Sequence, residues 1–146
     1  MYQRILVPIN GGPTSERALQ EAIKIAQGKA QIRLVYVLEE ILPLAAEGID
    51  LTNNAVIYEN MRKMAQATLA QAAEKVRNSG APVEISLIES LGQSVTDAIN
   101  QEANDWGAEV MVIGTHGRSG LSRLLLGSVA EGIVRDSTIP VLLLRV

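Results

Sequence analysis

Apolar and polar residues alternate along the chain in a pattern that predicts five strands separated by four helices. Five short runs are rich in apolar residues, as expected for strands of a sheet that is covered on both faces. These runs are residues 5–9, 32–38, 83–88, 109–113 and 139–144. Between them, apolar residues recur at helical spacing. The predicted helices are residues 13–27, 55–79, 94–104 and 124–136.

Local residues predict where the helices begin and end. Ser15 is a candidate N-cap of the first helix, and Gly28 follows its last turn. Residues 39–54 contain proline, glycine and several polar residues, and they predict a long loop. In the longest helix one face carries Ile57, Met61, Met64, Thr68, Ala72 and Val76. We expect the methionines of this face to pack against the sheet as part of the core.

Strand–helix alternation with apolar strands predicts an α/β fold, a doubly wound parallel sheet with helices on both faces. The length of 146 residues fits a single domain over residues 1–146, without a linker or an internal repeat. In open sheets of this kind, ligands bind beyond the carboxyl ends of the strands, where the strand order reverses. The ends of the first and fourth strands are therefore the places to search for a site.

Composition excludes several classes of function. The formal net charge of −3 argues against a general nucleic-acid binder, which needs a basic surface. The chain has no cysteine, so it forms neither disulfides nor thiolate metal sites, which fits a reducing compartment. No signal peptide is visible, and no apolar run approaches the ~20 residues of a membrane span. We therefore expect a cytoplasmic protein that does not enter a membrane.

A glycine motif follows the fourth predicted strand. Gly114, Gly117 and the pair Gly127-Ser128 fit the pattern G-x2-G-x9-G-[ST], with an apolar strand before it and a helical segment at its end. Glycines let backbone N–H groups approach a bulky anion, and a helix N-terminus adds free N–H donors and a favourable dipole. The motif thus predicts a phosphate site. It lacks the lysine of a Walker A loop and the spacing of a dinucleotide fingerprint.

This motif resembles the nucleotide-binding motif of the universal stress protein family. The opening segment, residues 5–15 with Ala18-Leu19 after it, and the closing segment, residues 137–144, resemble the same family. The resemblance covers essentially the whole chain. It implies the strand order 3-2-1-4-5, binding of ATP with Mg²⁺, a role in stress adaptation, and a homodimer. An aliphatic strand at the sheet edge, Ile139 to Leu144, is the expected dimer contact.

The resemblance also implies which residues contact the nucleotide. The base and the ribose are expected beside Pro8, Ile9, Asn10 and Val37. The ribose and the phosphates are expected above Ile113, Gly114, His116 and Gly117. The phosphates are expected against Gly127, Ser128, Val129 and Ala130. Backbone amides and one hydroxyl suit a phosphate, and an extended strand edge suits adenine.

One of these residues departs from the family pattern. The family usually has aspartate where this chain has Asn10, which keeps a carbonyl acceptor for ribose but lacks the charge. A metal-linked or basic role at this position is therefore in doubt. Gly12, where many relatives have serine, is a smaller departure that affects the turn.

No catalytic group stands out. His116 is the only histidine and has no carboxylate or nucleophile beside it in the sequence, so we interpret it as a loop residue next to the ligand. Arg118 and Arg123 either meet phosphates or remain solvated. The sequence favours a nucleotide-binding regulatory protein. Two alternatives remain: a nucleotide-free dimeric interaction module, favoured by Asn10, and a slow ATPase or phosphotransferase.

Overall fold

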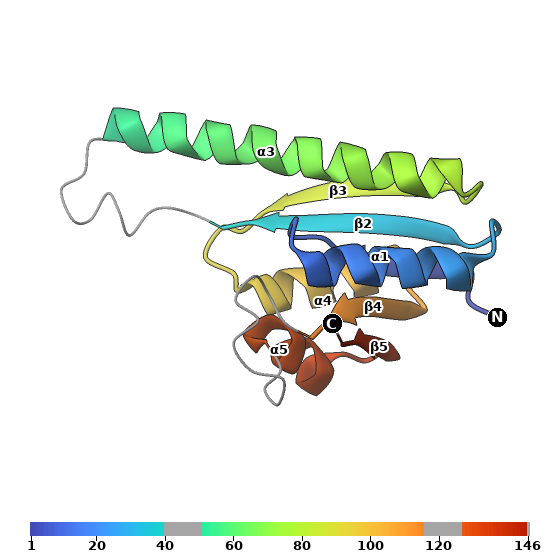
Figure 1. The fold of residues 1–146 in the computed structure, drawn as a ribbon. Helices are drawn as coiled ribbons and strands as arrows, with labels where there is room; N and C mark the ends of the chain where they lie inside the picture. The colour runs from blue at the N-terminus through green and yellow to red at the C-terminus, as the bar shows by residue number, and fades with distance from the viewer. Residues whose placement is uncertain (40–50, 116–126, 146) are drawn as a thin grey trace.

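The computed structural model describes residues 1–39, 51–115 and 127–145, with only the backbone described for 51–54. Its centre is a five-stranded parallel sheet in the order β3-β2-β1-β4-β5, which confirms the expected order (Figure 1). The strands are β1 (Arg4–Pro8), β2 (Gln31–Leu38), β3 (Val83–Glu89), β4 (Val110–Gly114) and β5 (Val141–Leu144). The order reverses between β1 and β4, so the switch point lies where the sequence placed it.

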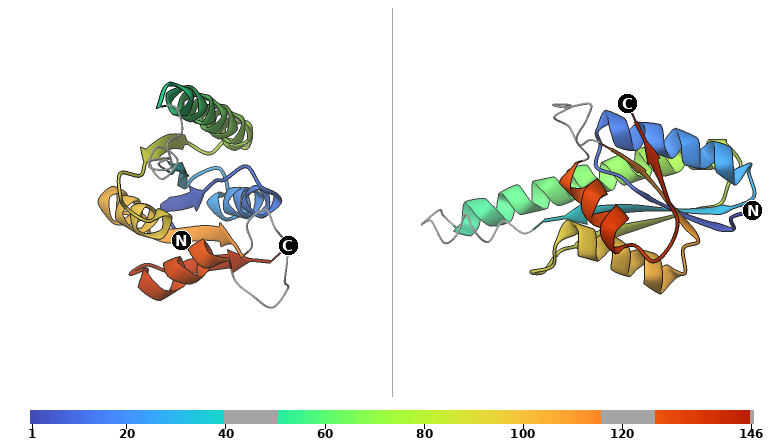
Figure 2. Two further views of the ribbon diagram at one scale, coloured as in Figure 1. Left: turned by 90° about the vertical axis from the view of Figure 1, so that its left-hand side faces the viewer. Right: turned by 90° about the horizontal axis from the view of Figure 1, so that it is seen from below.

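Helices cover both faces of the sheet, as predicted. They are α1 (Pro13–Ala26), α3 (Leu51–Asn78), α4 (Val95–Trp106) and α5 (Ser128–Asp136). Helices α1 and α3 lie on one face, whereas α4 and α5 lie on the other (Figure 2). Among the described residues, none of the helices is both long and apolar enough to cross a membrane.

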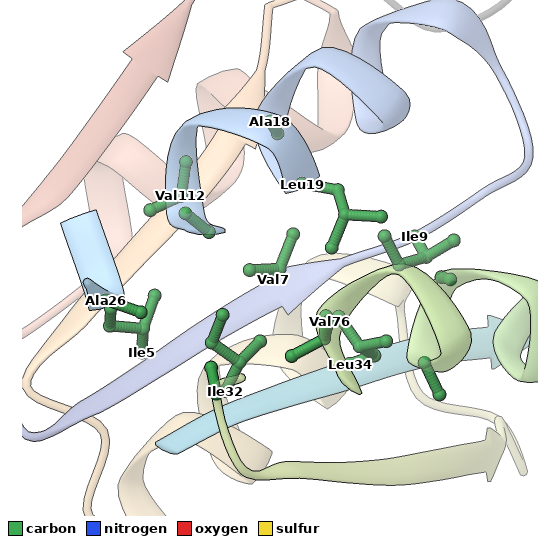
Figure 3. Close-up of a cluster of buried hydrophobic side chains, with 14 of the residues drawn as sticks. Ile5, Val7, Ile9, Ala18, Leu19, Ala26, Ile32, Leu34, Val76 and Val112 are labelled. Atoms are coloured by element: carbon green, nitrogen blue, oxygen red, sulfur yellow. The ribbon is translucent and has the colours of Figure 1, made fainter. Parts of the chain in front are cut away.

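Two aliphatic clusters form the core, one on each face of the sheet. Alternate residues of the strands point to opposite faces, so Ile5 and Val7 join one cluster while Leu6 joins the other. Figure 3 shows the first cluster, in which α1 and α3 pack against β1 and β2. The second cluster is closed by Trp106 of α4 and Ile133 of α5. Burial on both faces explains why the inner strands β1 and β4 are almost continuously apolar.

The first helix begins at residue 13 as predicted, but its N-cap differs from the prediction. The N-cap is Gly12 and the helix begins at Pro13, so the assignment of Ser15 as N-cap was wrong. Proline is well suited to this first helical position because its fixed φ fits the helix and its missing N–H would have had no partner there. Gln27 and Gly28 end the helix with left-handed φ angles of 51° and 70°, in agreement with the predicted glycine stop.

Helix α3 is longer than predicted and buries a different face. It begins at Leu51, so residues 51–54 are helical rather than part of a loop. Once a helix is nucleated, each added residue gains a hydrogen bond at little further cost, so weak helix formers can extend it. The buried residues are Ala65, Leu69, Ala72, Ala73 and Val76. Met64 is 69% exposed and Met61 is 36% exposed, so the prediction that both are core residues was wrong.

The position of α3 relative to the sheet explains why Met61 is exposed. Only the first turns of α3 extend beyond the carboxyl ends of β2 and β3 (Figure 1), and Arg62, next to Met61, pairs with Glu89 at the end of β3. Met61 thus lies at the edge of the sheet rather than over it, and the buried residues of the helix begin at Ala65.

Two other boundaries also shifted. The last helix begins at Ser128 rather than at residue 124, and residues 124–126 lie outside the described ranges. The last strand begins at Val141, because Pro140 precedes it and lacks an N–H for a sheet hydrogen bond.

Candidate functional site

A cavity of about 640 Å³ lies at the carboxyl ends of the strands, around the switch point. Every predicted site residue within the described ranges lines it: Pro8, Ile9, Asn10, Val37, Ile113, Gly114, Gly127, Ser128, Val129 and Ala130. His116 and Gly117, with Arg118 and Arg123, lie outside the described residues. The cavity thus brings together segments that are more than a hundred positions apart in the sequence. That these residues contact a nucleotide stays a prediction.

The topology explains this convergence. Strands β1 and β4 are neighbours and parallel, with Ile5 beside Val110 in the register, so both end at the same edge of the sheet. After β1 the chain passes to α1 on one face, whereas α5 lies on the opposite face. The divergence leaves a space between the starts of α1 and α5, as in other open α/β sheets.

The turn after β1 is held by side-chain hydrogen bonds. The Gly12 N–H donates to Oδ1 of Asn10 at 2.8 Å, which forms an Asx turn. The Ser15 hydroxyl donates to the Gly12 carbonyl at 3.1 Å and accepts from the Asn10 N–H at 3.3 Å. Gly11 between them has a φ of 81°, which glycine adopts without strain. Asn10 therefore shapes this wall of the cavity through its carbonyl oxygen, a role that an aspartate carboxylate would also fill.

Close packing against α1 requires a glycine at position 114. A Cβ at this position would lie 2.5 Å from Cβ of Thr14 and 2.8 Å from the Thr14 carbonyl oxygen. The first turn of α1 therefore contacts the end of β4 directly. This contact fixes the distance between the two sides of the switch point. Gly114 also lines the cavity, so its expected contact with a ligand stays a prediction.

The N-terminus of α5 forms another wall of the cavity. Gly127, its N-cap, has extended backbone angles (φ −62°, ψ 154°), and its N–H donates to the Thr115 carbonyl at 2.5 Å. This N–H is therefore not available to a phosphate, which corrects its predicted role as a donor. The next three N–H groups, of Ser128 to Ala130, lie in the first turn and have no acceptor within the helix. They are the donors that remain for an anion.

Charged side chains are scarce in the described part of the cavity. Of the described lining residues, Glu39 is the one that carries a formal charge, and neither lysine nor arginine is among them. No group of three or more histidine, cysteine, aspartate or glutamate side chains comes together within residues 1–39, 51–115 and 127–145. Recognition of an anion by these residues would therefore rest on backbone N–H groups, hydroxyls and the α5 dipole.

Several lining residues were missed by the sequence reasoning. The hydroxyl residues Thr14, Ser15 and Thr115 adjoin predicted site residues, so their position in the same segments was an available signal. Thr115 is 4% exposed, and its hydroxyl has no hydrogen-bond partner among the described residues. Met61 comes from the middle of α3, and nothing in the sequence connects it with the motif.

A second hollow of about 490 Å³ adjoins the main cavity. It lies between the start of α4 and the start of α5 and shares Glu39, Val95, Ser128 and Val129 with the main cavity. Its other lining residues are Ser90, Gly92, Gln93, Ser94 and Thr96. The α5 N-terminus thus borders both spaces, which leaves room beside it for an extended ligand.

A doubly wound sheet with a ligand-sized cavity at its switch point defines a class of small-molecule-binding α/β proteins. The family model of the universal stress protein family matches residues 1–145. The chain therefore belongs to the universal stress protein family. The universal stress protein YxiE of Bacillus subtilis is 30% identical over 156 residues, which cover 99% of this chain and 100% of the relative.

Solved structures share the fold. Protein MJ0577 of Methanocaldococcus jannaschii superimposes with a TM-score of 0.84 at 24% identity, covering 100% of this chain and 97% of its own. A universal stress protein solved in complex with cAMP gives a TM-score of 0.66 at 26% identity, covering 99% of this chain and 97% of its own. The similarity to MJ0577 concerns the fold alone. The second structure shares the fold and also contains a bound adenine nucleotide.

Proposed function

We propose that this protein is a regulatory, ATP-binding member of the universal stress protein family that acts as a dimer in stress adaptation. The observation that carries the proposal is the cavity at the switch point, which has the free N–H groups of the α5 N-terminus on one side and apolar strand ends on the other. An anionic tail and an apolar base are the two parts of a nucleotide. We also propose a single domain and a cytoplasmic location.

The cavity has the size and the chemistry that a nucleotide needs. Its volume of about 640 Å³ lies within the ~300–1,000 Å³ usual for small-ligand sites. Val37 and Ile9 supply apolar contact for a base, and Ser128 supplies a hydroxyl beside the helix N-terminus. The relative with bound cAMP supports an adenine nucleotide as the ligand. The preference for a triphosphate is our own inference from the space beside the α5 N-terminus.

Mg²⁺ would enter together with the triphosphate. Magnesium ions in nucleotide sites are commonly held by phosphate oxygens with only one or two protein ligands. The hydroxyl of Ser128 could supply an oxygen ligand at the end of the cavity where the phosphates are expected. Asn10 offers an amide carbonyl in place of a carboxylate. These residues fit a metal that arrives bound to ATP better than a metal held by the protein alone.

Nucleotide binding can be tested by thermal unfolding and by titration calorimetry. A ligand at 100 times its Kd stabilises the native state by about 2.7 kcal/mol, which corresponds to several degrees in Tm. We expect such a shift with millimolar Mg-ATP and a smaller one with Mg-GTP. Mass spectrometry of small molecules released from the gently purified protein would identify a nucleotide that copurifies. Flat melting curves with nothing copurified would favour the nucleotide-free interaction module.

The variant Gly127→Val tests the position of the site. We expect it to abolish ATP binding, because a β-branched side chain would stand where the phosphates approach the helix. The backbone angles at Gly127 are accessible to any residue, so the circular dichroism spectrum should remain nearly unchanged. If Gly127→Val binds ATP as well as the wild type, the nucleotide is not where we place it.

A further inference from the structure

We propose that Met61 forms the wall of the nucleotide cavity that contacts the base, and that the Arg62–Glu89 ion pair positions it there. The proposal rests on the proposed function and adds a specificity-determining residue to it. Met61 lies on α3, far in sequence from the glycine motif and from the ends of β1 and β4. Its role would make α3 part of the ligand site rather than only a cover for the sheet.

The first observation is the position of Met61 at the cavity. It is the lining residue that α3 contributes among the described residues, and it lies with Val37, Leu38 and Glu39 at the end of β2. Helix α3 covers the face of the sheet opposite to α5, whose N-terminus is the anion end of the cavity (Figure 2). The phosphates and Met61 are thus at different ends, and the part of a nucleotide that remains for Met61 is the base.

The second observation is that the Met61 side chain is exposed and does not pack in the core. The side chain is 36% exposed, and the residues one turn away on the same face, Ile57 and Met64, are 44% and 69% exposed. Of these three, only Met61 lines the cavity. A thioether packs favourably against an aromatic ring and adapts to its shape, so a planar base would cover apolar surface that water now contacts.

The third observation is the ion pair beside Met61. Arg62 Nε and Nη2 lie 2.8 Å and 2.7 Å from Oε1 of Glu89, the last residue of β3. Glu89 is beside Leu38 in the strand register, and Leu38 lines the same end of the cavity. Half-exposed pairs of this kind add little to stability. The pair does, however, fix this turn of α3 at the level of the end of β2, and so fixes where Met61 stands.

The test is titration calorimetry with Mg-ATP on the full chain. Loss of a thioether–ring contact and of the buried area should raise the Kd of Met61→Ala about tenfold. Met61→Leu keeps an apolar side chain of similar volume and should stay within about threefold of the wild type. Met64→Ala is the matched control, because Met64 is on the same face but does not line the cavity, and its Kd should not change.

Arg62→Gln tests the positioning role. We expect it to raise the Kd for Mg-ATP while the Tm of the ligand-free protein stays unchanged, since the pair adds little to stability. In the Met61→Ala background the same substitution should have no further effect, because there is no side chain left to position. An additive effect, or a fall in Tm that accounts for the weaker binding, would contradict positioning through Met61.

The results separate this inference from the proposed function. If the wild type binds Mg-ATP and Met61→Ala binds as well as Met64→Ala, the role of Met61 is wrong and the nucleotide site stands. If the wild type binds no adenine nucleotide, both are wrong. If Met61→Ala loses affinity while Met64→Ala does not, and Met61→Leu binds nearly as well as the wild type, Met61 contacts the base as we propose.

Discussion

The glycines of this chain serve different physical purposes, although they belong to one recognisable pattern. Gly114 leaves space for Thr14 of α1, Gly127 is an extended N-cap, and Gly11 supplies a left-handed φ in the turn after β1. The spacing in the sequence shows only that glycines recur. The neighbours of each one determine whether a substitution affects packing, backbone strain or the ligand.

Gly114→Ala should destabilise the protein. The added Cβ would lie 2.5 Å from the Thr14 Cβ and close to its backbone, so α1 must shift, at a cost of about 1–3 kcal/mol. Urea unfolding should show a lower midpoint with an unchanged slope. Gly127→Ala is the control without a packing clash, and it should lose about 0.5–1 kcal/mol because alanine is a poorer N-cap than glycine. Equal midpoints for the two variants would mean that the contact with Thr14 relaxes freely.

Ser128→Ala should weaken ATP binding without changing stability. It removes one hydroxyl beside the expected phosphates, which should reduce the binding free energy by about 1–2 kcal/mol, and by more if the hydrogen bond is charge-assisted. Asn10→Asp should preserve or improve binding, because the carboxylate can accept the same hydrogen bond from Gly12. Calorimetric Kd values check both expectations, and an unchanged Kd for Ser128→Ala would remove this hydroxyl from the site.

At the scale of elements, a polar network connects β2, β3 and α4 on one face of the sheet. The Arg33 guanidinium lies 2.5 Å from Glu84 on β3 and 2.6 Å from Glu102 on α4. It also lies 4.9 Å from the ring centroid of Trp106, within cation–π distance. Arg33 thus holds a helix and an edge strand together through one side chain of an inner strand.

This network predicts a pH dependence. The hydrogen bond from Arg33 holds the pKa of Glu84 below its ordinary value of 4.5. A carboxyl group whose pKa is lower in the folded than in the unfolded state stabilises the native state at any pH above its unfolded-state pKa. This stabilisation is lost as the pH falls through the folded-state pKa. Glu84→Gln should therefore lower the urea midpoint at pH 7, by no more than about 1 kcal/mol for so exposed a pair, and less at pH 3. An equal loss at both pH values would show that the charge of Glu84 is not involved.

At the scale of the whole molecule, the two edges of the sheet differ in charge. Strand β3 carries Glu84 and Glu89, which are paired with arginines, whereas residues 139–144 contain no charged residue. Leu142 of β5 is 37% exposed. An aliphatic edge without charges readily pairs with another strand, so the contrast favours β5 as the dimer contact.

Light scattering should therefore give the mass of a dimer at micromolar concentration. Leu142→Lys places a charge on the proposed contact and should shift the protein towards a monomer. Ile85→Lys is the matched control, because Ile85 is a 51% exposed aliphatic residue on the opposite edge strand, and this variant should remain a dimer. A monomeric wild type, or dissociation by Ile85→Lys alone, would contradict a dimer through β5.

The sequence by itself determined the architecture and the location of the candidate site. Buried parallel strands must be apolar on both faces and must be connected by helices, so the pattern of residues 5–9 and 109–113 already implied a doubly wound sheet. Resemblance to the family added the strand order. Because the carboxyl ends of neighbouring parallel strands share one edge, Asn10 and Gly114 had to lie near each other.

Only the tertiary structure decided which side chains and donors form the walls of the cavity. Helical spacing cannot tell where a helix leaves the sheet, so Met61 was predicted in the core although it lies where the strands end. Spacing also cannot tell that the Gly127 N–H is taken by Thr115, or that Gly114 faces Thr14. Those facts depend on the distance between elements far apart in the chain. Packing fixes that distance, and local sequence does not encode it.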